Sequence, residues 1–410
     1  MTPNTNYQKL KESYLFHHIA QKTGKYLEEN PGTKLYRMGI GDVSLPLAPA
    51  VITALHEAVD DQAKKATFHG YMPEVGDPEL RELIRAFYGT RGVALDLDEV
   101  FVSSGASDEL GDILDLFGPG QVSMIMEPAY PAYVDANIMT GNSVVHVPAG
   151  KENGFLPVPA DGEKALAEAR AAGEISGGPD LIYICSPNNP TGAVFTKEKL
   201  TAWVDWAKEK DAVIIFDAAY EAFIEEDLPH SIYEIPGAKE CAVEICSLSK
   251  TAGFTGTRLG YTVIPKTLVR AGLALNPMWV RNRTTKTNGV SYIIQKGARA
   301  VFTDEGQKQI HQNIAVYKEN GRVLTETFDR LGIWYTGGKN APYIWIQCPG
   351  GDSWAFFDRL LHEVQVVGTP GEGFGACGEG YFRFSCFGSP EDTRVAADRL
   401  WLLLKEELGK

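Results

Sequence analysis

Residues 244–260 read Glu-Ile-Cys-Ser-Leu-Ser-Lys-Thr-Ala-Gly-Phe-Thr-Gly-Thr-Arg-Leu-Gly, and the rest of the chain is organised around this stretch. A short apolar run leads to Ser247 and Ser249, directly before Lys250, and Arg258 follows in a loop rich in glycine and threonine. A lysine amine attacks an aldehyde only when it is neutral, and a dry, electropositive setting favours that form. Two hydroxyls and a guanidinium are donors that suit a phosphate dianion. The stretch therefore suggests a cofactor with an aldehyde and a phosphate, although such a tetrapeptide alone is more often a surface turn.

Composition excludes several classes of protein. The 410 residues allow two or three domains, and the net charge of −14 without a long acidic run argues against a nucleic-acid surface. The six cysteines lie in or beside apolar runs and contain no Cys-x-x-Cys pair. They indicate reduced thiols, and neither a disulfide framework nor a zinc site is expected. The first residues do not resemble a secretion signal, and no apolar run is long enough to span a membrane, so we expect a cytoplasmic enzyme without metal.

A second phosphate-binding element is predicted upstream. An apolar strand over 100–103 runs into Ser-Gly-Ala-Ser at 104–107, after which apolar residues recur at helical spacing. A strand, a turn of small residues and a helix start expose backbone N–H groups that can bind phosphate. We therefore expect Ala106 and Ser107 to contact the phosphate. Asp108 and Glu109, in the first turn of the helix, must then face away because their carboxylates would repel the phosphate.

Polar residues follow other predicted strands where these end. The run Ala-Val-Ile-Ile-Phe at 212–216 is apolar on both faces, as expected for a central parallel strand, and Asp217 comes next. Asp217 can pair with a pyridinium nitrogen, while Asn189 and Tyr220 can hydrogen bond to a phenolate oxygen on the same ring. Prolines fix a loop that carries Tyr130 and Tyr133, either of which could stack on a planar ring, and we assign the ring face to Tyr130. These roles together match pyridoxal 5′-phosphate, although each residue alone also has an ordinary structural explanation.

Two basic side chains are candidates for binding the substrate and for the chemical steps. Lys250 would bond covalently to the cofactor aldehyde and, once displaced by substrate, move a proton at the substrate Cα. Arg383 follows an aromatic pair in a predicted strand at 381–385 and can bind an α-carboxylate with two parallel hydrogen bonds.

The order of elements predicts an α/β fold with two domains. We expect an N-terminal arm and part of the small domain over 1–46, and a large cofactor-binding domain over 47–296. We expect a mostly parallel sheet between helices in the large domain. The small α+β domain, built from both termini, would be completed by 297–410. We also expect residues 267–300 to be largely helical and residues 364–367 to form a strand.

At this point the chain resembles the class I/II, fold-type I aminotransferases over nearly its whole length, and within them the LL-diaminopimelate aminotransferases. The general motifs are Ser-Pro-Asn-Asn-Pro-Thr-Gly at 186–192, Asp-Ala-Ala-Tyr at 217–220 and Ser-Leu-Ser-Lys with Arg258. The more specific stretches are Tyr-Leu-Phe at 14–16, Gly-Ile-Gly-Asp at 39–42, Glu-Pro-Ala-Tyr-Pro-Ala-Tyr-Val-Asp at 127–135, residues 251–266, Gly-Gly-Lys-Asn-Ala-Pro-Tyr at 337–343 and Gly-Glu-Gly-Tyr-Phe-Arg at 378–383.

The resemblance implies a homodimer whose active sites lie at the subunit interface. The implied reaction interconverts LL-2,6-diaminopimelate and 2-oxoglutarate with tetrahydrodipicolinate and glutamate, in lysine biosynthesis. The implied cofactor contacts include Tyr71, reaching the partner's phosphate, and Asn288. The implied substrate contacts are Tyr14, Gly39, Glu74, Ser107, Tyr130, Asn189, Asn288 and Arg383. One position departs from the family pattern, which has Gly-Ala-Lys at 105–107 where this chain has Gly-Ala-Ser.

Three alternatives remain open from the sequence. A related aminotransferase could use a different amino donor, and the serine at 107 bears on that choice. A carbon–sulfur or decarboxylating lyase could use the same scaffold, since the bound cofactor can direct several reactions. A regulator that binds the cofactor without catalysis is the third, but the predicted cofactor contacts are all filled and no DNA-binding segment is appended.

Overall fold

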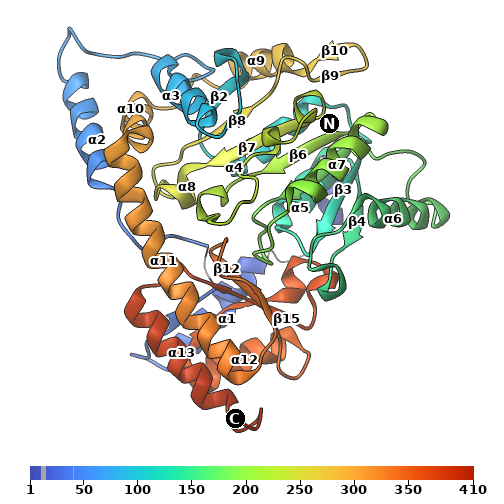
Figure 1. Ribbon diagram of the computed structural model, residues 1–410, viewed down its shortest axis with the longest axis vertical. Coiled ribbons are helices and arrows are strands. Elements are labelled where there is room, and N and C mark those ends of the chain that lie inside the picture. Colours follow the sequence, from blue (N-terminus) through green and yellow to red (C-terminus); the bar gives the residue numbers. More distant parts are fainter. Residues whose placement is uncertain (11–14, 40) are drawn as a thin grey trace.

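The structure is a computed structural model that describes residues 1–10, 15–39 and 41–410. It has a larger and a smaller body, and the long helix α11 (Asp304–Leu331) runs along both (Figure 1). In the part of the chain that is described, the larger sheet has seven strands in the order β2-β8-β7-β6-β5-β3-β4. These strands are β2 (Val100–Ser103), β3 (Val122–Glu127), β4 (Ser143–Pro148), β5 (Leu181–Cys185), β6 (Val213–Asp217), β7 (Ala242–Ser247) and β8 (Gly260–Val263).

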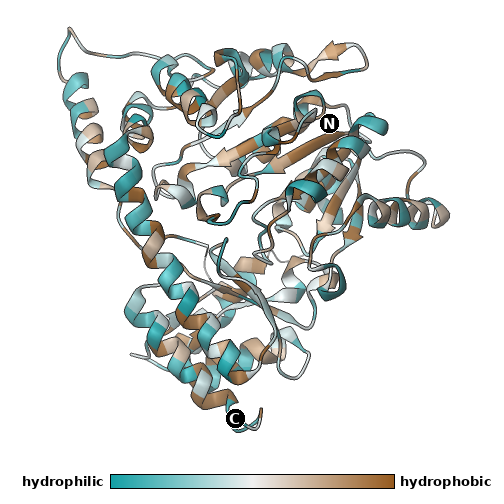
Figure 2. Ribbon diagram, viewed as in Figure 1, coloured by the Kyte–Doolittle hydropathy of each residue, from teal (hydrophilic) through white to brown (hydrophobic). Residues whose placement is uncertain are grey.

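The larger sheet is parallel except at β8, which runs antiparallel to both of its neighbours, β2 and β7. Every residue of β5, β6 and β7 is buried, as expected when helices cover both faces of a sheet. Figure 2 shows the same pattern as hydrophobic colours along these strands and mixed colours on the surrounding helices. The helices of this body are α2 (Pro49–Gln62), α3 (Pro78–Gly89), α4 (Ala106–Asp112), α5 (Pro131–Thr140), α6 (Pro159–Ala171), α7 (Lys197–Glu209), α8 (Leu248–Thr251), α9 (Leu275–Lys286) and α10 (Tyr292–Arg299).

The smaller body is built from both ends of the chain. Its antiparallel sheet has the order β11-β12-β15-β14, and β1 (Tyr36–Arg37) pairs in parallel with β13 (Val366–Val367). The sheet strands are β11 (Tyr335–Gly337), β12 (Tyr343–Gln347), β14 (Thr369–Pro370) and β15 (Tyr381–Ser385). The helices are α1 (Leu15–Glu29), α12 (Ser353–Val364) and α13 (Pro390–Leu404). The expected fold class is therefore confirmed, while the domain limits at 46 and 296 stay a prediction.

Helix α11 connects the two hydrophobic cores. Thr303 caps its start, where its side chain accepts a hydrogen bond from Gly306 N–H, and Gly332, in the left-handed conformation, caps its end. Near its start, Ile310 packs into the core of the larger body, whereas Leu324, near its end, packs into the core of the smaller one. One rigid element thus fixes the spacing of the two bodies at the cleft between them.

Two expectations about local structure are wrong in detail. Residues 267–274 form a hairpin of β9 (Val269–Arg270) and β10 (Leu273–Ala274) rather than a helix. Its two central residues, Ala271 and Gly272, both have positive φ, which is the backbone of a tight two-residue hairpin turn. The strand expected over 364–367 is shorter, because α12 continues to Val364. None of the described helices is long and apolar enough to cross a membrane.

Candidate active site

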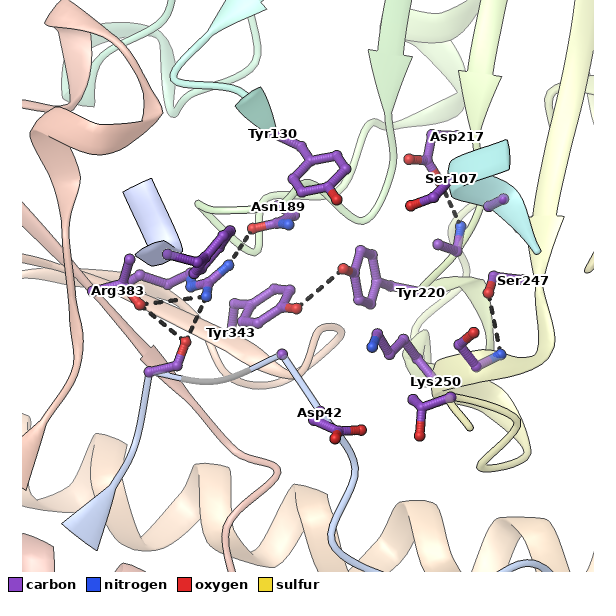
Figure 3. Close-up of a pocket in the computed structure, with 18 of the residues that line it drawn as sticks. Asp42, Ser107, Tyr130, Asn189, Asp217, Tyr220, Ser247, Lys250, Tyr343 and Arg383 are labelled. Atoms are coloured by element: carbon purple, nitrogen blue, oxygen red, sulfur yellow. Dashed lines mark hydrogen bonds between the residues drawn. The ribbon is translucent and has the colours of Figure 1, made fainter. Parts of the chain in front are cut away.

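A cavity of about 560 Å³ lies at the carboxyl end of the large sheet, where the smaller body and the N-terminal segment meet it. Most of the residues expected at a cofactor or substrate line it together (Figure 3). They are Gly39, Ala106, Ser107, Tyr130, Asn189, Asp217, Tyr220, Ser247, Ser249, Lys250, Arg258 and Arg383. Because the carboxyl ends of parallel strands meet at one edge of a sheet, residues far apart in sequence converge there.

Lys250 lies on the short helix α8, directly after the buried strand β7. The side chain of Ser247 caps this helix by accepting a hydrogen bond from Ser249 N–H at 3.1 Å. Burial lowers the pKa of the Lys250 amine to about 8; nearby Asp42 opposes this shift, whereas the positive charges of Arg258 and Arg383 add to it. A large fraction of the amine is therefore neutral near pH 8, as nucleophilic attack and proton transfer require.

The donors expected for a phosphate lie next to one another. Arg258 has a φ of 60° and donates from Nη1 to Ser249 Oγ at 3.4 Å. The guanidinium also lies against Gly105, where an added Cβ would come within 2.5 Å of Nη2. Gly105 has a φ of 125°, a backbone conformation that favours glycine, and Arg258 lies against it at the turn that precedes α4. The hydroxyls, the guanidinium and the first-turn N–H groups form a donor set suited to a phosphate dianion.

Glu109 faces away from this turn, as the sequence requires. Its Oε1 accepts a hydrogen bond from Arg283 at 2.9 Å, and its Oε2 accepts one from Thr262 at 2.6 Å. Burial raises the pKa of Glu109 to about 7, although the charge of Arg283 favours the ionised form. Of the two acidic residues in the first turn of α4, Glu109 is thus held away from the turn by these contacts, and Asp108 is exposed.

Asp217 ends β6, and each of its carboxylate oxygens accepts one hydrogen bond. Tyr133 donates to Oδ2 at 2.5 Å, and Ala219 N–H donates to Oδ1 at 3.0 Å. Burial raises the pKa of Asp217, and these two hydrogen bonds oppose that shift. The role of Tyr133 was missed from the sequence, which shows only two tyrosines one helical turn apart. Tyr130 borders the cavity, with its ring edge-on to that of Tyr133 at 5.6 Å between centroids.

Arg383 lies on β15 and is only 1% exposed. Its Nη1 donates to Asn189 Oδ1 at 2.6 Å, and its Nη2 donates to the Gly39 carbonyl at 2.6 Å and to Thr369 Oγ1 at 3.4 Å. The guanidinium thus joins the N-terminal segment, the large body and the small body at one point, as Figure 3 shows. Its rigid, planar donors suit a carboxylate that enters the cavity.

The other expected contacts lie elsewhere. Tyr71 is 89% exposed, and Tyr71, Glu74 and Asn288 do not line the cavity of their own chain. The loops that carry them are neighbours, since a Cβ added at Gly289 would come within 2.8 Å of the Met72 carbonyl oxygen. These three residues therefore form a second group, on loops packed against each other. Tyr14 lies outside the described residues.

The chain is similar in sequence to known proteins of one family. The family model described as aminotransferase class I and II matches residues 33–400. An LL-diaminopimelate aminotransferase of Agathobacter rectalis is 46% identical over 412 residues, covering 97% of this chain and 98% of that protein. The protein of the same name from Lachnospira eligens is 47% identical over 404 residues, with the same coverage.

A solved structure supports the same conclusion. The L,L-diaminopimelate aminotransferase of Chlamydomonas reinhardtii superposes with a TM-score of 0.89 at 37% identity, covering 98% of this chain and 99% of that one. The similarity therefore includes both bodies and the cavity between them. The fold is that of a fold-type I aminotransferase, and the chain belongs to the class I and II aminotransferase family.

Proposed function

We propose that this enzyme transfers an amino group between LL-2,6-diaminopimelate and 2-oxoglutarate, giving tetrahydrodipicolinate and glutamate in lysine biosynthesis. The observation that carries the proposal is the similarity to proteins named LL-diaminopimelate aminotransferase, which extends over 97% of the chain. The similarity extends over both bodies and therefore over the segments that line the cavity. We also assign the protein to the cytoplasm.

Aminotransferases of this family generally use pyridoxal phosphate, and the side chains around the cavity suit that group. When bound, it supplies an aldehyde that exchanges amino groups and a ring that withdraws electrons from the substrate. Ser247, Ser249, Arg258 and the turn at 105–107 would hold its phosphate, since they supply hydroxyl, guanidinium and backbone N–H donors. Gly105, whose φ of 125° favours glycine, lies in that turn against the guanidinium of Arg258.

The ring of the cofactor would lie between residues from neighbouring strands. Asp217 would hold the proton on its ring nitrogen, because a buried carboxylate with a donor on each oxygen remains available as an anion. Tyr220 and Asn189 would hydrogen bond to its ring oxygen, and Tyr130 would cover one face. These side chains orient the ring and exclude water from it.

Two basic side chains act on the substrate. Arg383 would bind the α-carboxylate, and a charge-assisted pair with a carboxylate is stronger than its present hydrogen bonds to neutral oxygens. Lys250 can take the proton from the substrate Cα at Nζ and return it, because its amine titrates near neutral pH, with a pKa of about 8. The same amine anchors the cofactor between reactions.

We also propose that the protein forms a homodimer. Tyr71, Glu74 and Asn288 lie together outside the cavity of their own chain, with Tyr71 89% exposed. They would complete the site of a second subunit, with Tyr71 on the phosphate and Glu74 on the distal ammonium of the substrate. Asn288 would lie between cofactor and substrate.

Ser107 favours one alternative, a related aminotransferase with a different donor. It lines the cavity at a position where the resemblance leads us to expect lysine. A hydroxyl offers a substrate's distal carboxylate a neutral and shorter-reaching hydrogen bond.

The test is a panel of amino donors, including LL-diaminopimelate, aspartate, alanine, cysteine and aromatic amino acids, each assayed with 2-oxoglutarate. We expect LL-diaminopimelate to give the highest kcat/KM. A higher value for another donor would refute the proposed substrate and support the alternative. Release of ammonia or sulfide without glutamate formation would instead identify a lyase.

A further inference from the structure

The loop Gly-Gly-Lys-Asn-Ala-Pro-Tyr at 337–343 connects β11 and β12 of the smaller body and is tied to the larger one. Asn340 Oδ1 accepts a hydrogen bond from Glu225 N–H at 3.0 Å, and its Nδ2 donates to Glu226. Lys339 forms an ion pair with the same Glu226. Glu225 and Glu226 follow Tyr220 closely in sequence, so this loop is attached to the segment that carries a proposed cofactor ligand.

The end of the loop is held by close backbone contacts. A Cβ added at Gly192 would come within 2.5 Å of the Tyr343 carbonyl oxygen, and one added at Gly337 within 2.2 Å of the same atom. Both glycines have positive φ, at 68° and 82°. Only glycines allow this packing. The backbone of Tyr343 is therefore fixed against the loop that carries Asn189. The position of the Tyr343 Cα, from which the side chain extends, is fixed with it.

That side chain lies between two functional residues of the cavity (Figure 3). Tyr343 is 1% exposed, and its hydroxyl is hydrogen bonded to that of Tyr220 at 3.0 Å. Its ring lies beneath the guanidinium of Arg383, with 4.4 Å from Cζ to the ring centroid. A cation in this position is attracted to the face of the ring. Tyr343 thus contacts both Tyr220, the proposed partner of the cofactor's ring oxygen, and Arg383, the proposed partner of the substrate's α-carboxylate.

Both phenols are neutral at ordinary pH, because burial raises the pKa of Tyr220 and of Tyr343. When the Tyr220 hydroxyl donates a hydrogen bond to the ring oxygen of the cofactor, its own oxygen can accept a hydrogen bond from Tyr343. A phenol that accepts a hydrogen bond is a stronger donor, because hydrogen bonds in a chain polarise one another. The other titratable and charged groups facing this pair are Tyr130, Cys185, Asp217 and Arg383.

We propose that Tyr343 is a positioning residue of this active site, which orients Tyr220 toward the cofactor's ring oxygen and Arg383 toward the substrate's α-carboxylate. The proposal rests on the proposed function for the identity of cofactor and substrate. It also gives the 337–343 motif a function, because that loop places the side chain of Tyr343 in contact with both Tyr220 and Arg383. The two effects come from different parts of the tyrosine, its hydroxyl and its ring.

Two variants separate these effects. Tyr343→Phe removes the hydroxyl and keeps the ring beneath Arg383, whereas Tyr343→Leu removes both. Tyr335→Phe is the matched control, since this tyrosine of the same small sheet bonds to Asp329 and does not line the cavity. Each protein is loaded with pyridoxal phosphate, its visible absorbance is titrated against pH, and KM is measured for an amino acid and for 2-oxoglutarate. Circular dichroism and thermal unfolding establish that each variant is folded.

In Tyr343→Phe we expect the midpoint of the pH titration of the bound cofactor's visible absorbance to rise by roughly 0.3 to 0.7 pH unit. We expect little change in KM. The rise follows because a weaker donor at Tyr220 stabilises the anionic ring oxygen less. In Tyr343→Leu we expect the same rise and an increase of KM for both substrates of roughly three- to tenfold. The control should match the wild type in both measurements.

An unchanged midpoint in a folded Tyr343→Phe protein would overturn the proposal, even if Tyr343→Leu fails to fold. An unchanged KM in a folded Tyr343→Leu protein would also overturn it. If the wild type prefers another amino donor, the proposed substrate fails while both comparisons still apply, since every amino acid presents the same α-carboxylate. A wild type that binds no pyridoxal phosphate would overturn both proposals together.

Discussion

Replacing Tyr133 by phenylalanine should raise the pKa of Asp217 and shift the pH dependence of cofactor binding. The change removes one of the two hydrogen bonds that stabilise the ionised carboxylate and leaves the one from Ala219 N–H. Phenylalanine retains the ring, which stacks on Tyr183 with 5.3 Å between centroids. The substitution therefore tests the hydroxyl with little change in packing.

The magnitude follows from the charge on the acceptor. A hydrogen bond to a charged group contributes roughly 1.5 to 3 kcal/mol, which corresponds to a shift of roughly 1 to 2 pKa units. Burial already raises the pKa of Asp217, and the phenol of Tyr133 opposes that rise, so its loss must move the pKa further up. The groups facing the carboxylate from other elements are Cys185 and Tyr220.

The assay is the dissociation constant of pyridoxal phosphate measured as a function of pH. Affinity should fall on the acid side as the carboxylate of the free protein takes up a proton and can no longer pair with the ring nitrogen. In Tyr133→Phe this fall should occur at a pH roughly 1 to 2 units higher than in the wild type. Tyr183→Phe, which removes a neighbouring phenol of the same ring stack, is the control. A folded Tyr133→Phe protein with the wild-type pH profile would refute the reasoning.

Three further predictions concern the proposed contacts. Lys250→Ala should leave a folded protein without the visible absorbance of the covalently held cofactor and with nearly all turnover lost; substantial turnover would exclude Lys250 as the catalytic amine. Arg383→Lys should raise KM roughly tenfold for amino acids of every side chain, because it loses the paired donors; a loss limited to one substrate would assign the arginine to the distal end. Glu74→Gln should reduce the preference for LL-diaminopimelate over alanine, and Ser107→Lys should lower KM for LL-diaminopimelate roughly tenfold. If neither substitution changes that preference, the distal end is recognised by other residues.

Much of the fold was predictable because its signals are local. The all-apolar runs of β5 and β6 are typical of strands covered on both faces, and the structure has them in the larger sheet. Where a local signal is missing, the prediction was wrong, as in the hairpin at 267–274. The turn at Ala271 and Gly272 depends on two left-handed residues, one of which is an alanine, and alanine carries no such signal.

The sequence by itself determined the set of chemical groups. It placed a lysine between serines and an arginine, an aspartate after a central strand and an arginine on a late strand, and the convergence of strand ends then implied a common site. The cavity that collects these residues agrees with that inference. The residues at 71, 74 and 288 were expected from a partner subunit, and that assignment stays a prediction.

Only the tertiary structure decided which side chains support these groups. Tyr133 and Asp217 are 84 positions apart, and Tyr220 and Tyr343 are 123 positions apart, yet each pair is joined by one hydrogen bond. A hydrogen bond depends on distances of a few tenths of an ångström and on angles, which residue spacing along the chain does not contain. The candidate reactive groups can therefore be named from their types and their places at strand ends. The residues that contact them are set by tertiary packing, within the larger body for Tyr133 and between the two bodies for Tyr343.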